Sequence, residues 1–367
     1  MKNKSKNIGI IVVFFLLIYG LMLANIITPD REVSYSERRK LAKTPEFSNR
    51  KLLSGDLFES YEKYFLDQFV LRDNFREIKA FMTFTVFNQK DNNSIYLINN
   101  KIYKLEYPLN EKSIINGANK INEVNDKYLE GVNVSYAIIP DKNYFVAKEN
   151  GYPSMDYDRL EELMKERLSS IQYINLFEVL DIDDYYNTDI HWRQEELVDV
   201  ARLIMDKMGL GVNKDQTSYK ENSLFPFYGS YYGQAAVRVK PDSLIYLTNS
   251  NIEEALVYDH IDKTYSEVYD KERFSTIDSY DLFLSGPKSI LTISNSKSKS
   301  NRNLILFRDS FGSSIAPLML EQYAKITLVD LRYMSTDLLD SYVDFSDYQD
   351  ALFLYNTHIL NNSYMLK

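Results

Sequence analysis

An uncharged apolar run near the N-terminus constrains this chain more than any other stretch of its sequence. Residues 8–27, IGIIVVFFLLIYGLMLANII, contain no charged side chain. About twenty apolar residues are enough for a helix that crosses a bilayer. Three lysines lie within the seven residues before the run, and such basic flanks stay on the cytoplasmic side. The sequence therefore predicts a basic cytoplasmic tail over residues 1–7, a membrane anchor over 8–27 and an extracytoplasmic remainder.

A cleaved signal peptide is the alternative interpretation of this run. Signal peptides have a shorter apolar core and end in an A-x-A-like cleavage site. Ala24 is the only suitable residue, and Met22, two positions before it, fits that site poorly. We therefore expect an uncleaved anchor.

The composition of the chain excludes several classes of function. The chain has 367 residues, 45% of them hydrophobic, and a formal net charge of −9. That is enough apolar material for one large domain or two smaller ones. The acidic balance argues against a nucleic-acid partner. The absence of cysteine excludes disulfides, thiolate metal sites and cysteine nucleophiles.

The pattern of apolar residues changes along the chain. A polar linker follows Pro29, and apolar residues at helical spacing from Leu57 to Phe81 then predict one or two amphipathic helices that pack on the main domain. From residue 95 onward, short apolar runs alternate with helical segments. This alternation predicts an α/β domain over residues 95–367, with a mostly parallel sheet covered on both faces. The linker and the amphipathic helices together occupy residues 28–94.

The elements of this domain follow from the same patterns. The expected strands are SIYLI and KIYKL, joined as a hairpin across Asn99-Asn100, then NVSYAII, YINLFEVL, NLILF, KITLVDL and ALFLYN. The expected helices cover residues 111–129, 158–171, 194–209 and 313–323. Residues 215–300 show less regular patterning.

The only tryptophan of the chain follows an Asp-x-His pair in NTDIHW, residues 187–192. In an extended segment, residues i and i+2 point to the same side. Asp189 can therefore orient the imidazole of His191 and stabilise its protonated form. His191 also precedes a predicted helix, whose positive end would disfavour a protonated resting state and suit a general base.

A nucleophile for that base is found in NLILFRDSFGSSIAPLM, residues 303–319, where Ser310 stands between an apolar strand and a small-residue helix start. This turn would expose the hydroxyl at the carboxyl edge of the sheet, with N–H groups of the new helix facing an oxyanion. The three residues follow the logic of a serine acyl-transfer triad, in which Ser310 attacks, His191 takes the proton and Asp189 orients His191.

Each part of the triad also has a purely structural interpretation. Asp189 or Ser310 alone could cap a helix, and His191 alone is more often a structural histidine. Only their combination favours catalysis. A metal site is a weaker hypothesis because His260 and His358 are isolated in the sequence, so we expect neither a metal nor another cofactor.

Asp189-Ile190-His191-Trp192 resembles the signature of the DHHW-motif proteins, an SGNH-hydrolase-like group related to the alginate O-acetyltransferases (AlgX/AlgJ-like proteins). The strand followed by Arg-Asp-Ser-Phe-Gly is the second specific match. Softer landmarks are SERRKLAKTPEF, FESYEKYFLDQFVLRDNFR, AIIPDKNYF and FYGSYYGQ. Two positions depart from the pattern. Ile190 replaces the second motif residue, and Arg308 replaces the glycine of a G-D-S block, which bears on whether the chain is a simple hydrolase.

The resemblance implies an SGNH-type α/β sandwich with Asp189, His191 and Ser310 as its triad. The sheet would be wound in a permuted order, because the serine here follows the Asp/His pair. Oxyanion and substrate contacts would come from neighbouring loops, with Asn356 as the oxyanion donor. The tyrosine-rich segment around Tyr231 would offer faces to sugar rings, or would only pack on the core. The full set of expected contacts is Asn356, Arg332, Tyr333, Gly229, Ser230, Gly233, Tyr231 and Lys142.

For function, the resemblance implies a membrane-anchored extracytoplasmic O-acyltransferase, in the first place an O-acetyltransferase, acting on a cell-surface or exported polysaccharide through an acyl-serine. The acyl group would come from a partner such as a multispanning membrane acyltransferase. A carbohydrate esterase (deacetylase) with the same triad is one alternative. A non-catalytic polysaccharide-binding component of an assembly is another.

Overall fold

An eight-stranded sheet organises the larger part of the protein. The computed structural model describes residues 2–211 and 218–367, and within them the order of this sheet is β10-β9-β11-β13-β12-β14-β5-β6. The strands from β13 to β6 run parallel, whereas β11, β9 and β10 pair antiparallel at the other end. The bounds are β5 Asn133–Ile139, β6 Gln172–Asn175, β9 Leu256–Asp259, β10 Thr264–Ser266, β11 Ile290–Ser294, β12 Asn303–Arg308, β13 Lys325–Val329 and β14 Asp350–Asn356.

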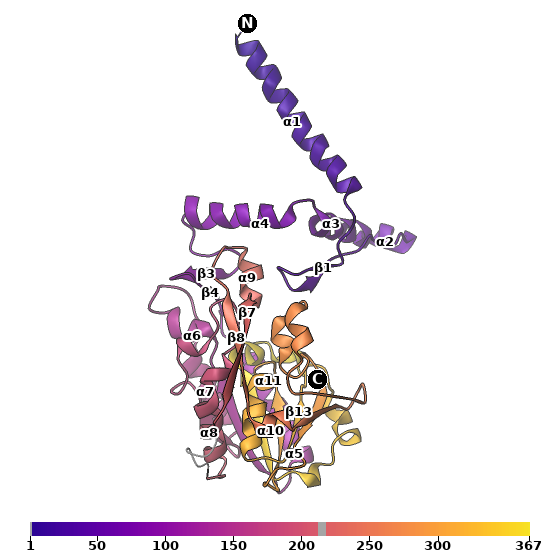
Figure 1. Cartoon of the computed structure of the whole chain (residues 1–367). Helices are drawn as coiled ribbons and strands as arrows, with labels where there is room; N and C mark the ends of the chain where they lie inside the picture. Colours follow the sequence, from indigo (N-terminus) through magenta and orange to yellow (C-terminus); the bar gives the residue numbers. More distant parts are fainter. Residues whose placement is uncertain (1, 212–217) are drawn as a thin grey trace. The chain divides into compact units, whose positions relative to one another are not determined.

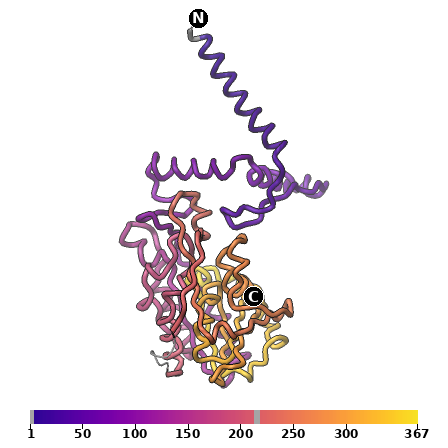
Figure 2. The backbone as a smooth tube through the Cα atoms, viewed as in Figure 1, coloured from indigo at the N-terminus to yellow at the C-terminus, as the bar shows by residue number. Residues whose placement is uncertain are grey.

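This order is the permuted one predicted from the sequence. Strands β12 and β14, from the C-terminal part of the chain, pair with β5, from its first half. Figure 2 shows the corresponding magenta and yellow parts of the tube lying side by side. The predicted α/β class and mostly parallel sheet are therefore confirmed. Strands β9 to β11 lie in the stretch of sequence that shows little regular patterning. The patterning is weak there because these strands are short and partly polar.

Alternate residues of each central strand feed two separate cores. In β12, Leu304 and Leu306 face one core, whereas Ile305 and Phe307 face the other. Helix α8 (Val198–Lys207) and the 3-10 segment η6 (Ala316–Glu321) supply the first core, and α5 (Glu111–Tyr128), α7 (Tyr157–Arg167) and α12 (Thr357–Asn361) supply the second. The apolar runs of the central strands reflect this burial on both faces.

Two small antiparallel pairs accompany the sheet. Strands β3 (Ile95–Ile98) and β4 (Lys101–Lys104) form the predicted hairpin. Asn99 and Asn100 both take positive φ, as a tight two-residue turn requires. Strands β7 (Lys220–Phe227) and β8 (Asp242–Thr248) form the other pair. The remaining short helices are α6 Lys142–Val146, α9 Ser230–Ala235, α10 Ser250–Glu253 and α11 Gly312–Ile315.

The chain separates into two units. The first comprises the N-terminal residues through Asn93 together with Tyr232–Arg238, and the second comprises Ser94–Tyr231 together with Val239–Lys367. The segment 232–238, which the sequence assigned to the main domain, thus belongs to the first unit. The elements of the first unit are α1 Lys2–Ile27, β1 Val33–Ser34, β2 Arg39–Lys40, α2 Asn49–Ser54, α3 Asp56–Gln68, α4 Arg72–Phe81 and the π-helical turn η1 Met82–Val86.

Helix α1 is the long indigo helix of Figure 1. An 18-residue window within its residues 4–27 has a mean hydropathy of 2.8, and none of this window is buried. It is long and apolar enough to cross a membrane, a property that an N-terminal signal sequence shares. Met1 of the predicted basic tail lies outside the described residues.

The apolar stripe of α3 and α4 is exposed. Phe58 and Phe65 of α3, and Phe75, Ile78 and Phe81 of α4, keep between 45% and 66% of their surface accessible. Leu57 of the same stripe is buried. Helical spacing alone does not identify what an apolar face contacts, so the packing of these helices on the main domain stays a prediction.

Candidate active site

Ser310, His191 and Asp189 form a continuous chain of hydrogen bonds. The Ser310 hydroxyl lies 2.7 Å from His191 Nε2, and His191 Nδ1 lies 2.5 Å from Asp189 Oδ1. Because Nδ1 faces a carboxylate, it carries the ring proton, so Nε2 accepts from the serine hydroxyl. Asp189 is fully buried and His191 nearly so, whereas Ser310 is partly exposed. The arrangement can remove a proton from a hydroxyl that reaches solvent.

The turn after β12 holds Ser310 at the carboxyl edge of the parallel sheet. Asp309 Oδ1 accepts from the Phe311 N–H at 2.9 Å, and its Oδ2 accepts from the Asn356 N–H at the end of β14 at 2.7 Å. Burial raises the pKa of Asp309. A Cβ at Gly312 would lie 2.6 Å from Arg308 Cβ, so only glycine allows this tight start of α11.

Asp189 is held from two sides. Its Oδ1 accepts from the backbone N–H of His191 at 3.0 Å, and its Oδ2 accepts from the Ser230 N–H at 2.5 Å. A Cβ at Gly229 would overlap the backbone of Thr188 and Asp189. The predicted residues Gly229 and Ser230 therefore lie against the triad carboxylate, where their backbone supports it.

Lys142, another predicted site residue, is buried behind this loop. Its Nζ donates to the carbonyl oxygens of Ile102, Tyr186, Asn187 and Asp189 at 2.7 to 3.3 Å. Burial lowers the pKa of Lys142 to about 7, and the carboxylates of Asp189 and Asp242 act in the opposite direction. Through these hydrogen bonds, Lys142 stabilises the backbone of the loop that carries Asp189.

Asp242 supports the same loop and was not anticipated from the sequence. Its Oδ1 accepts from the N–H and the side-chain amide of Asn187 at 3.0 and 2.9 Å. Its Oδ2 accepts from the N–H of Thr188 at 2.8 Å and from the Thr188 hydroxyl at 2.6 Å. Its position at the first residue of β8 carries no local signal of this role.

Tyr280 was also missed. Its ring stacks on the imidazole of His191, and its hydroxyl donates to Ser314 at 2.8 Å. The indole N–H of Trp192 donates to the same Ser314 oxygen at 2.9 Å. Trp192, as expected, is a packing residue, and with Tyr280 and Phe311 it forms the wall behind the imidazole.

The sequence argument about a helix dipole at His191 is wrong. Helix α8 begins only at Val198, after a short 3-10 turn at Gln194–Glu196. Trp192 instead pairs with Tyr185 in an isolated antiparallel bridge. The imidazole therefore lies several residues before the helix, beyond the reach of its positive end.

Other predicted contacts have different environments. The Asn356 amide nitrogen donates to the carbonyl oxygens of Ile139 and Pro140 at 3.0 and 3.4 Å, so the structure gives it a backbone partner rather than a free oxyanion position. Arg332 forms two hydrogen bonds to the Asp330 carboxylate.

The remaining predicted contacts also differ among themselves. Tyr333 is half exposed and Tyr231 is buried. Gly233 packs against the backbone of Ser36 within the first unit. The buried ring of Tyr231 favours the core-packing interpretation of this segment over the sugar-binding one.

Among the residues that the structure describes, no group of three or more His, Asp or Glu side chains could hold a metal ion. His260 accepts or donates to the Thr292 hydroxyl at 2.8 Å, and His358 pairs with Glu106 at 3.0 Å. Both of these histidines lie outside the contacts of Ser310.

The sheet order defines an α/β protein with a mostly parallel central sheet, and Ser310 lies at the end of β12 within it. The family described as DHHW protein matches residues 171–329 of the chain. The resemblance to the DHHW proteins drawn from the sequence is therefore confirmed. No curated protein matches the sequence.

Solved structures show the same fold. A DHHW family protein from Eubacterium siraeum is 20% identical, with a TM-score of 0.62 over 75% of this chain and 95% of that chain. PatB1 from Bacillus cereus, solved with a sulfonyl adduct, is 18% identical, with a TM-score of 0.57 over 72% of this chain and 95% of that chain. The O-acetyltransferase domain of Pseudomonas putida AlgJ is 11% identical, with a TM-score of 0.44 over 73% of this chain and 92% of that chain. A TM-score this low does not establish a common fold.

Proposed function

We propose that the protein is a membrane-anchored extracytoplasmic O-acyltransferase that moves an acyl group, in the first place acetyl, onto a cell-surface or exported polysaccharide. The observation that carries this proposal is the unbroken chain from the Ser310 hydroxyl through His191 to the buried carboxylate of Asp189. Such a chain activates a serine for attack on an acyl carbonyl.

In the first half-reaction, Ser310 Oγ bonds to the acyl carbon while its proton passes to His191 Nε2. The bond to the donor's leaving oxygen or sulfur then breaks, and the leaving group takes that proton. Asp189 stabilises the imidazolium between these two events. No acceptor for the Ser310 N–H lies among the described residues, so this group is available to stabilise the oxyanion.

In the second half-reaction, a sugar hydroxyl gives its proton to His191 Nε2 and its oxygen attacks the acyl-serine carbonyl. The Ser310–acyl bond breaks, and the proton returns to Ser310 Oγ. Water in place of the sugar would make the same residues an esterase. The difference between the two reactions therefore depends on acceptor binding and on exclusion of water.

Helix α1 supports the membrane location, since its apolar span is unburied and long enough for a bilayer. The basic residues at its start would stay in the cytoplasm and leave the catalytic unit outside. A donor is needed on that side, and a multispanning membrane acyltransferase is the partner we propose. A polysaccharide is the proposed acceptor.

The likeness to PatB1 supports the presence of a nucleophile on this fold. A sulfonyl group becomes attached to a protein by reaction with a nucleophilic side chain, and PatB1, which shares the fold, was solved with such an adduct. The sulfonyl reagent therefore provides a second probe of Ser310, independent of any acyl donor.

The test is mass spectrometry of the full-length protein in detergent after exposure to p-nitrophenyl acetate or to a sulfonyl fluoride. We expect one acetyl or sulfonyl group on Ser310, lost in Ser310→Ala and strongly reduced in His191→Ala. Ser313→Ala is the matched control, because Ser313 lies in the same helix start without contacting His191. Labelling elsewhere, or equal labelling in Ser310→Ala, would refute the nucleophile.

Added oligosaccharides separate the remaining alternatives. Transfer of acetyl from the acyl-serine to the sugar supports the transferase, whereas release to water at an unchanged rate supports the esterase. If no adduct forms and polysaccharide binding survives Ser310→Ala, the non-catalytic binding component becomes the better hypothesis.

A further inference from the structure

Helix α4 and the π-helical turn after it carry an apolar face that is exposed within the first unit. We call the side chains of Leu71, Phe75, Ile78, Phe81, Met82 and Val86 the outer face. All six are exposed. Leu71, Phe75, Ile78, Met82 and Val86 follow one another at steps of three or four residues, so they project from one side of the helix.

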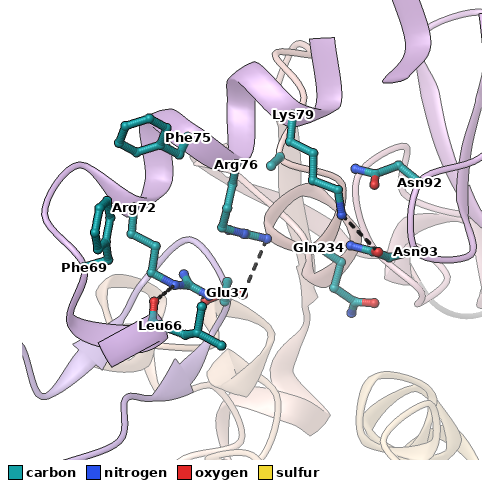
Figure 3. Close-up of a pocket in the computed structure, with 11 residues that line it drawn as sticks. Glu37, Leu66, Phe69, Arg72, Phe75, Arg76, Lys79, Asn92, Asn93 and Gln234 are labelled. Atoms are coloured by element: carbon teal, nitrogen blue, oxygen red, sulfur yellow. Dashed lines mark hydrogen bonds and ion pairs between the residues drawn. The ribbon is translucent and has the colours of Figure 1, made fainter. Parts of the chain in front are cut away.

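The opposite side of α4 is polar and packs within the first unit. Arg72 Nη1 lies 2.5 Å from Glu37, and Arg76 lies 3.4 Å from the same carboxylate. Arg76 also donates to the Gly233 carbonyl at 2.6 Å. The Arg72 and Glu37 side chains are only 14% and 15% exposed. Figure 3 shows a groove lined by Arg72, Arg76 and Lys79, and Phe75 also lines it.

Two arginines of α4 are therefore more buried than the apolar side chains of the outer face. A helix on a soluble protein buries its apolar stripe and exposes its charges. Here the side chains of Arg72 and Arg76 are turned inward, whereas Lys79 and the side chains of the outer face are exposed. Contiguous exposed apolar surface of this kind marks a contact with another protein or with a membrane.

The chain that leaves α1 is tied to the corner between α3 and α4. Asn25, in the last turns of α1, accepts from the Val70 N–H at 2.7 Å. Gln68 accepts from the Arg31 N–H and donates to the Arg31 carbonyl at 2.9 and 3.0 Å. If α1 crosses a bilayer, its end marks the membrane surface. These bonds then hold the corner at that surface.

We propose that the outer face of α4 lies in the headgroup region of the same bilayer that α1 crosses, as a second, interfacial contact with lipid. The proposal rests on the membrane anchor described under the proposed function. A lipid surface is favoured as the occupant because the outer face begins at Leu71, next to Val70, which is bonded to α1. Phenylalanine and aliphatic side chains on one side of a helix are the usual inserting groups of interfacial helices.

The absence of native cysteine allows a direct test in the full-length protein. An environment-sensitive fluorophore is attached to Ile78→Cys or Phe81→Cys, and the protein is reconstituted into phosphatidylcholine–phosphatidylglycerol vesicles. Leu16→Cys in the middle of α1 is the control for insertion. Lys165→Cys on α7 is the control for an exposed, ion-paired surface position. Quenchers are iodide in water and lipids that carry a nitroxide at a shallow or a deep position.

We expect the probes at 78 and 81 to lose iodide quenching on reconstitution and to be quenched most by the shallow nitroxide. The probe at 16 should respond to the deep nitroxide, and the probe at 165 to iodide alone. Adding Ile78→Asp to the Phe81→Cys protein should restore quenching of the probe by iodide, because a carboxylate is costly in lipid and should move the helix toward water. Since both positions are exposed, we expect the fold to tolerate these changes, which far-ultraviolet circular dichroism checks.

Iodide quenching at 78 and 81 together with deep quenching at 16 would overturn the interfacial contact and leave the anchor standing. Protection of 78 and 81 from both iodide and lipid nitroxides would overturn it as well, since a second copy or a membrane protein would then cover the face. No lipid quenching at 16 would refute the anchor and this proposal with it.

Discussion

The imidazole of His191 lies flat against the ring of Tyr280, with ring centroids 3.8 Å apart and planes 4° apart. Tyr280 is itself buried, and its hydroxyl donates to Ser314. The stack leaves the two ring nitrogens of His191 free to bond Asp189 and Ser310 in the plane of the imidazole. The orientation of the proposed general base thus depends on a residue far from it in sequence.

Removing this ring should lower reactivity at Ser310. Tyr280→Ala would let the imidazole tilt, and a misplacement of about 1 Å can cost roughly 100-fold in rate. We expect the rate of acetylation by p-nitrophenyl acetate to fall roughly 10- to 100-fold. Tyr280→Phe keeps the ring and should lose far less. Equal losses in the two variants would show that the hydroxyl, rather than the stack, is what matters.

Gly229 is expected to tolerate no side chain. A Cβ there would overlap the backbone that presents Asp189, and overpacking of this kind costs about 1–3 kcal/mol. We expect Gly229→Ala to reduce the free energy of unfolding by this amount and to slow acetylation of Ser310. The free energy of unfolding is measured by urea unfolding, followed by the fluorescence of Trp192. This residue is the only tryptophan of the chain and is buried.

The neighbouring Ser230→Ala variant is the control for this prediction. The Ser230 hydroxyl has no hydrogen-bond partner in the described part of the structure, and the bond to Asp189 comes from the backbone. We expect Ser230→Ala to keep both stability and reactivity. Comparable destabilisation in the two variants would mean that the close approach at Gly229 is not the cause.

Lys142→Met should weaken the second unit from its interior. The variant removes the Lys142 donor from the buried carbonyl oxygens of Ile102, Tyr186 and Asp189. The half-buried carbonyl of Asn187 also loses it but still accepts from the Ile102 N–H. Each loss of a partner for a buried polar group costs about 1–3 kcal/mol. We expect the free energy of unfolding to fall by about 2–5 kcal/mol, measured with Trp192 fluorescence. The exposed Lys148→Met is the matched control, and an equal effect there would argue against the role assigned to Lys142.

The stability of the second unit should depend on pH through Glu195. Burial raises the pKa of Glu195 to about 7, and its Oε2 has no hydrogen-bond partner in the part of the chain that the structure describes. The folded pKa lies above the unfolded value, so the stabilising contribution is complete below the unfolded pKa and is lost as pH rises through 7. Partial exposure reduces the size of this effect.

Glu195→Gln should remove this dependence. We expect the variant to match the wild type near the unfolded pKa and to exceed its free energy of unfolding by about 1–3 kcal/mol once Glu195 is ionised. Urea unfolding on either side of pH 7 measures the difference. Glu196→Gln, which removes the adjacent exposed carboxylate, is the control. A Glu195→Gln curve parallel to the wild type would disprove the assignment.

Much of this fold follows from local patterns. The apolar runs of β5, β12, β13 and β14 and the helices between them were legible because strand and helix periodicities are properties of short segments. Strands β9 to β11 could not be recognised from sequence periodicity. Short, partly polar strands are stabilised chiefly by the neighbouring strands with which they pair.

The residue types and their spacing along the chain set the chemistry available to the protein. Asp189 and His191 face the same side because they are two residues apart, and Ser310 lies at a turn because a strand ends and a helix begins there. The contact between His191 and Ser310, which are 119 positions apart, arises only when distant segments of the chain pack together. The same holds for the support of the imidazole by Tyr280 and for the exposure of the apolar side of α4 within the first unit. These relationships depend on where distant segments pack, and local periodicity carries no information about that.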